Sequence, residues 1–194
     1  MGIGLAMMID AGFGVAPADA FFTGVSRTSG LTVGTVLFLV SIVMVIGSWA
    51  LGIKPAIGSL VTFVGIAVVV DATRAVLALM GAPDWSMLAR IPLWVGGLTL
   101  FCAGVMGIFG SNLGTSPYDQ VVRAVALRTG RSLGFGRAIV DVLAFTGALL
   151  LGGSWGWGTV VILVTVPLAL NLVLPRYRRL LGMEVAEVDV EPVG

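Results

Sequence analysis

The chain has 194 residues, of which 58% are hydrophobic and 11% are charged, and its mean hydropathy is +1.08. Soluble domains average about 45–50% apolar and about 25% charged residues, so this chain has too few charges to cover a water-facing surface. The net charge of +1 excludes a basic field for nucleic acid. The chain has no histidine and a single cysteine, Cys102, which excludes an internal disulfide and argues against zinc sites and enzymes. We therefore expect an integral membrane protein, with no cofactor and no catalytic residues.

Long apolar runs predict about six membrane-crossing helices, because one crossing needs about 20 mostly apolar residues. The first run, residues 2–13, is short and predicts a half-length helix or part of a longer first span. The run between Asp141 and Arg176 is too long for one crossing, and Gly152-Gly153-Ser154 divides it into two. The acidic tail, residues 180–194, is expected to be mobile and outside the membrane. The other predicted spans lie near residues 33–51, 57–80, 93–111, 133–151 and 158–174.

An internal repeat relates the two halves of the chain. Residues 2–71 align without a gap on residues 102–171, with identical residues at 14 of the 70 positions. We therefore predict a first repeat at residues 1–80, a connecting loop at 81–92 and a second repeat at 93–179. Three spans in each half would make the second repeat enter the membrane from the opposite side, which is a recurrent transporter architecture.

The most specific shared motif is Gly-x-x-Pro-x-Asp, at residues 14–19 and 114–119. Glycine ends one helix, proline suits the first position of the next, and aspartate then faces the positive end of the helix dipole. Each motif predicts a short helix that is either interfacial or re-entrant. The aspartates have either a structural role or a role in binding a substrate or an ion. The residues concerned are Gly14, Pro17, Asp19, Gly114, Pro117 and Asp119.

Polar residues at membrane depth supply further candidates, because an ionisable group in hydrocarbon is costly. Asp71 aligns with Asn171 in the repeat, and both are candidate ligands of a cation or proton. If Asp71 acts this way, Asp71→Asn should abolish coupled flux without preventing insertion. The alternative is that Arg74, three residues on, neutralises Asp71 on the same helix face.

Two more polar candidates lie near helix ends before the motifs, namely Asp10 and Asn112. Arg137 and Asp141 are four residues apart and are expected to pair on one helix face. We expect this pair to be structural.

The basic residues predict the topology. Alternating loops place three basic residues on one side, Arg27, Arg74 and Arg90. The other eight lie on the opposite side, which the positive-inside rule makes cytoplasmic, together with both termini. Arg176, Arg178 and Arg179 follow the last span and are expected to anchor it at anionic lipid. The cytoplasmic set is Lys54, Arg123, Arg128, Arg131, Arg137, Arg176, Arg178 and Arg179.

The sequence resembles the bacterial YczE/YitT-like family of polytopic membrane proteins. The resemblance depends on residues 12–19, 23–34, 52–59 and 112–119, which are mainly glycine and proline motifs, and it extends over most of residues 2–175. It implies location in the bacterial cytoplasmic membrane. It implies no substrate and no catalytic residues.

Two functions remain open. The first is a small-solute or ion transporter whose site lies between the inverted halves. The second is a membrane scaffold or accessory protein that transports nothing, in which the glycine-rich faces serve packing or homo-oligomer formation. The lipid bilayer is a partner in both cases, and nucleic acid in neither.

Overall fold

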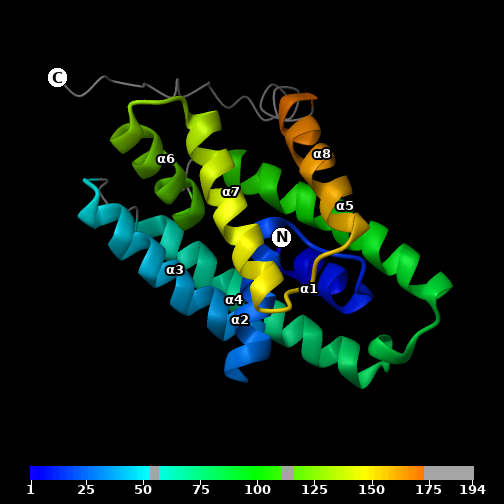
Figure 1. The fold of residues 1–194 in the computed structure, drawn as a ribbon. Coiled ribbons are helices and arrows are strands. Elements are labelled where there is room, and N and C mark those ends of the chain that lie inside the picture. The colour runs from blue at the N-terminus through cyan, green and yellow to red at the C-terminus, as the bar shows by residue number, and fades with distance from the viewer. Residues whose placement is uncertain (53–56, 111–115, 173–194) are drawn as a thin grey trace.

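The computed structural model describes residues 1–52, 57–110 and 116–172, and this part of the chain is all helical (Figure 1). The short helices of the two halves precede longer ones, as the motifs predict. The elements are α1 (Gly2–Ala11), α2 (Pro17–Ser29), α3 (Val33–Ala50), α4 (Ile57–Leu79), the 3-10 turn η1 (Ala82–Asp84), α5 (Met87–Gly110), α6 (Pro117–Thr129), α7 (Leu133–Leu150) and α8 (Trp157–Leu172).

Within the described residues, three helices are long and apolar enough to cross a membrane. They are α3, residues Val61–Leu79 of α4, and residues Met87–Ile108 of α5. A fourth span is formed if α6 and α7, which meet at an angle of 120°, act together as one broken crossing. The apolar helix α1 has 10 residues, so it is about 15 Å long and shorter than one crossing. The described part of this helical membrane protein therefore has three or four candidate spans, and the predicted arrangement of about six is not confirmed.

The helix boundaries repeat at an offset of 100 residues. The bounds of α6 and α7 equal those of α2 and α3 shifted by 100. The same local signals set them in both halves. Gly30 and Gly130 end the short helices with left-handed φ angles of 74° and 64°, which glycine adopts without strain. Thr32 and Ser132 then cap the long helices by accepting a hydrogen bond from the backbone N–H three residues on.

Each short helix packs on the long helix of the other half. Helix α2 lies against α7, and α6 lies against α3 (Figure 1). Each short helix also contacts the long helix that follows it in the chain. Helix α1 packs against α4 and α5, which brings the beginning of the chain to the middle of the molecule. The two halves are thus interlocked, and their shared interface consists largely of repeat-related helices.

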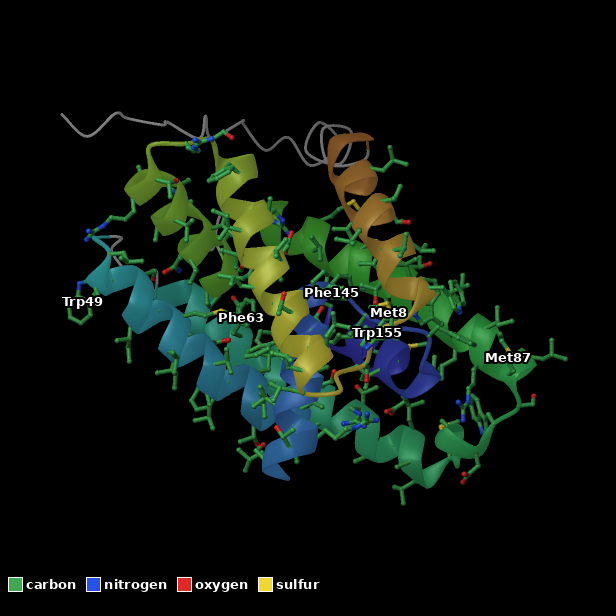
Figure 2. The ribbon with its side chains drawn as sticks, viewed as in Figure 1. Met8, Trp49, Phe63, Met87, Phe145 and Trp155 are labelled. Carbon is green, nitrogen blue, oxygen red and sulfur yellow. The ribbon has the colours of Figure 1, made fainter. Side chains whose placement is uncertain are left out.

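The burial pattern separates an interior from an apolar outer surface. Leu5 and Met8 on α1 are buried, as are Leu37 on α3 and Val70 on α4. Figure 2 shows Met8 in the interior, whereas Trp49 and Met87 lie at the outer edge. Trp49 is 64% exposed, and many large apolar side chains of α3, α4 and α7 are exposed with it. Such a surface is compatible with lipid and not with water.

The first long helix of the second half begins earlier than the sequence predicts. Helix α5 starts at Met87, inside the segment 81–92 that is predicted as a loop. Arg90 and Pro92 suggest a boundary in the sequence, but both lie within the helix. Pro92 is the sixth residue of the helix and has no backbone N–H to donate to the carbonyl of Leu88, four residues before it.

Candidate functional site

The turn before α2 is fixed by close backbone packing. Gly14 has a φ of 110°, and a Cβ there would lie 2.6 Å from the backbone nitrogen of Gly156. The Val15 N–H donates to the Ser154 carbonyl at 3.2 Å. The Trp94 indole N–H donates to the Gly14 carbonyl at 2.9 Å. Gly14 does not end α1 as the motif suggests, because Gly12 is the left-handed C-cap of that helix. Gly14 instead allows the close approach of the loop before α8 to the start of α2.

The second motif holds its aspartate in a polar network. Pro117 is the first residue of α6 and Ser116 is its N-cap, with the Ser116 Oγ accepting from the Asp119 N–H at 3.1 Å. The same hydroxyl lies 2.8 Å from Asp119 Oδ2, to which it donates. Arg137 Nη1 lies 3.3 Å from Asp119 Oδ1. Asp119 therefore has a cation and a hydroxyl to stabilise its negative charge.

Tyr118 extends this network to α7. Its hydroxyl donates to the Asp141 carboxylate, and the Arg137 guanidinium lies 5.6 Å from the centre of its ring. Arg137 Nε lies 3.6 Å from Asp141 Oδ2, so the pair expected from the spacing of four is present. We call Ser116, Tyr118, Asp119, Arg137 and Asp141 the α6–α7 polar cluster.

The first motif places its aspartate in different surroundings. Pro17 is the first residue of α2, as predicted, and Asp19 is 7% exposed. In residues 1–52, 57–110 and 116–172, no hydrogen bond or ion pair reaches the Asp19 carboxyl group. Burial raises the pKa of Asp19 above its usual range. The repeat equivalents of Ser116, Tyr118, Arg137 and Asp141 are Ala16, Ala18, Leu37 and Ser41.

Asp71 contacts the beginning of α3. The Thr32 hydroxyl donates to Asp71 Oδ2 at 2.6 Å, and the Gly34 N–H donates to Oδ1 at 2.8 Å. A carboxylate at a helix N-terminus satisfies backbone donors that have no intrahelical partner. Both oxygens of Asp71 are thus engaged in joining α4 to α3.

Arg74 does not neutralise Asp71, and the expected pairing of these two residues is wrong. Arg74 Nε instead lies 2.9 Å from Asp10 Oδ1 on α1, and the Asp10 side chain is 6% exposed. The ion pair joins α1 to α4, because α1 packs directly on that helix. Asp10 therefore forms an interhelical contact in the interior.

A hollow of about 210 Å³ lies between the two halves. Its lining includes both members of two repeat-related pairs: Ala18 with Tyr118, and Met44 with Ala144. The side chains around the hollow are apolar except for Tyr118, which is also a member of the α6–α7 polar cluster. The full lining is Ala18, Phe21, Phe22, Met44, Tyr118, Val140, Leu143 and Ala144.

Several predicted residues are not placed by the structure. Asn171 lies within α8, of which only the backbone is described at that position. Asn112, Gly114, Arg176, Arg178 and Arg179 lie outside the described residues, as does the tail 180–194.

Sequence reasoning missed three residues that organise the site. Thr32 reaches Asp71, Trp94 reaches the Gly14 turn, and Tyr118 reaches Asp141. A signal for the first was available, because Thr32 precedes a long apolar run and aligns with Ser132. Tyr118 lies inside the second motif, where alanine stands in the first.

The fold defines a helical integral membrane protein in which helices of the first and second halves of the chain pack on one another. The chain belongs to the family described as "Family of unknown function (DUF6198)", whose model matches residues 1–175. No solved structure matches the chain.

Curated relatives support the membrane assignment. The chain is 26% identical over 189 residues to the "Uncharacterized membrane protein YczE" of Bacillus subtilis (strain 168), covering 96% of this chain and 86% of the relative. It is 24% identical over 184 residues to the "Uncharacterized protein YyaS" of the same strain, covering 92% and 89%. An "Uncharacterized protein" of Haemophilus influenzae is 24% identical over 166 residues, covering 86% and 74%. The resemblance inferred from the glycine and proline motifs is thus confirmed.

Proposed function

We propose that the protein is a transporter of the bacterial cytoplasmic membrane that moves a small solute through a site between two inverted halves. The observation that carries this proposal is the hollow lined by Ala18 with Tyr118 and by Met44 with Ala144. The hollow is bordered by equivalent positions of both halves, so it lies where the two halves meet. Transporters with inverted repeats place their substrate sites at such an interface, next to broken helices.

The inverted arrangement has independent support. The helix bounds repeat at an offset of 100 residues, and the packing is reciprocal, with α2 on α7 and α6 on α3. The distribution of basic residues fits opposite orientations and cytoplasmic termini. A rocking motion of one half against the other would then expose the hollow to each side of the membrane in turn.

The lining indicates the class of solute. An apolar cavity of about 150 Å³ binds a molecule as small as benzene, so a hollow of about 210 Å³ fits one small apolar group. The Tyr118 hydroxyl, which donates to Asp141, offers a nearby polar contact. We therefore propose a small organic solute with an apolar body and one polar group.

The test is a thermal-stability screen of the purified protein against small organic solutes, since a ligand that binds the folded state raises its melting temperature. Ala144→Met fills the hollow with the side chain that the first half carries at Met44, and we expect it to abolish both the stabilisation and the uptake of the same solute by proteoliposomes. The matched control is Ala138→Met, an exposed position on the same helix. Uptake that is equal in Ala144→Met and Ala138→Met would place the solute elsewhere.

The second candidate is a scaffold that holds a partner at the membrane. The apolar lining of the hollow favours it, because polar solutes would find few hydrogen-bond partners there. Absence of any stabilising solute, together with specific retention of a partner membrane protein by wild type and by Ala144→Met alike, would support the scaffold.

A further inference from the structure

The two carboxylates of the duplicated motif have opposite environments. Asp119 accepts a hydrogen bond from the Ser116 hydroxyl and forms an ion pair with the Arg137 guanidinium. Asp19 is buried on α2, and no hydrogen bond or ion pair from the described residues reaches its carboxyl group. The two equivalent positions thus hold one aspartate in a network of polar partners and one that is buried without such a network.

Apolar burial determines the protonation state of such a group. Removing an ionised carboxylate from water is far more costly than removing the neutral acid, so an unpartnered buried carboxyl group takes up a proton. Helix α2 has 13 residues, about 20 Å, and is too short to span the bilayer. The helix packs against α7 and α3, and Asp19 in its first turn is buried.

No charged group on the neighbouring helices compensates Asp19. Helix α3 carries no titratable side chain between Val33 and Ala50. The two charged residues of α7, Arg137 and Asp141, pair with each other and with residues of α6. On α2 itself, Arg27 donates to the Gly152 carbonyl at 2.8 Å.

The acid on α1 is also engaged, because Asp10 pairs with Arg74. Of the acidic residues in the interlocked core, Asp19 is thus the one whose charge has no partner among the described residues.

We propose that Asp19 is a proton-binding site that gains and loses a proton during the working cycle. The proposal deepens the proposed transport function, because a proton bound at α2 would couple proton movement to solute movement. The first half then supplies the titrating group.

The test uses dicyclohexylcarbodiimide, an apolar reagent that reacts with protonated carboxyl groups, on the full-length protein in detergent. The acid proton moves to a nitrogen of the reagent, and the carboxylate oxygen bonds to its central carbon. Acyl migration from oxygen to nitrogen then leaves an N-acylurea that carries the added mass of one reagent molecule. Peptide mass mapping locates that mass on the chain.

We expect the added mass on Asp19 at acidic and neutral pH, with loss of labelling at alkaline pH. The Asp119→Asn variant is the matched control, because it alters the same position of the repeat, and we expect its Asp19 labelling to be unchanged. A water-soluble carbodiimide should label Asp19 much less. Labelling of Asp119 in place of Asp19, or labelling of Asp19 that does not vary with pH, would overturn the proposal.

A second measurement does not depend on transport. Infrared difference spectra of the wild-type protein between acidic and alkaline pH should contain the carbonyl band of a protonated carboxylic acid, and Asp19→Asn should lack it. Labelling of Asp19 without any solute uptake would leave the proton site intact and refute only the transporter. Uptake that needs no proton gradient, together with an unlabelled Asp19, would refute only the proton site.

Discussion

The close contact between α3 and α4 can be tested by adding one methyl group at a glycine. A Cβ added at Gly34, in the first turn of α3, would collide with the Ala67 carbonyl of α4 and lie 2.5 Å from Asp71 Oδ2. The equivalent glycine of the second half, Gly134, has open space, with its nearest atom at 3.9 Å, the Ser132 Oγ. The repeat thus supplies a matched pair of substitutions at the same turn of equivalent helices.

The expected cost of Gly34→Ala follows from three terms. Overpacking against a backbone atom costs about 1–3 kcal/mol. Displacing Asp71 weakens hydrogen bonds to a charged group, which contribute about 1.5–3 kcal/mol in water and less between membrane helices. Alanine has a higher helix propensity than glycine, which offsets at most about 1 kcal/mol of this loss of stability. We expect a net loss of about 2–4 kcal/mol for Gly34→Ala, and for Gly134→Ala no loss or a gain of up to about 1 kcal/mol.

The assay is reversible unfolding in mixed micelles by titration with a denaturing detergent, followed by circular dichroism. Tryptophan fluorescence, from the five tryptophans of the chain, gives a second probe of the same transition. If the two alanine variants changed the free energy of unfolding equally, the tight approach of α3 to α4 would be refuted.

The same assay tests two further contacts. Arg74→Gln leaves the buried Asp10 without its cation and should cost about 1–3 kcal/mol, less than the 3–5 kcal/mol typical of fully buried pairs because Arg74 is partly exposed. Adding Asp10→Asn should recover most of that loss, and a double variant no more stable than Arg74→Gln would contradict the pairing. Thr32→Val removes an N-cap and the bond to Asp71, so it should cost clearly more than Ser132→Ala, which removes only a cap of about 1 kcal/mol. Equal losses would show that the hydrogen bond from Thr32 to Asp71 contributes nothing to stability.

Local signals were enough to predict the helices around the duplicated motif. Proline at the first helical position and glycine at the end set the bounds of α2 and α6, and the apolar run after Thr32 sets α3. These helix bounds depend on residues close by in the sequence, so they can be predicted without knowing how the helices pack. The spacing of four between Arg137 and Asp141 belongs to the same class, since both lie on one helix.

Partners on different helices could not be predicted in the same way. Arg74 has Asp71 three residues away but pairs with Asp10 on α1. The choice depends on how α1 packs on α4, and Asp71 is engaged by the start of α3. The spacing of residues along one helix shows which of its own side chains can meet. It does not show whether a neighbouring helix offers a better partner.

The repeat predicts equivalent positions, but the chemistry at those positions has diverged. Asp19 and Asp119 begin equivalent helices, yet only Asp119 has a hydroxyl and a guanidinium beside it. The sequence already shows the difference, since Ala16 and Leu37 stand where the second half has Ser116 and Arg137. Divergence at these positions leaves the two equivalent aspartates with different contacts among the described residues, because Asp119 has a hydroxyl and a guanidinium beside it and Asp19 is buried without them.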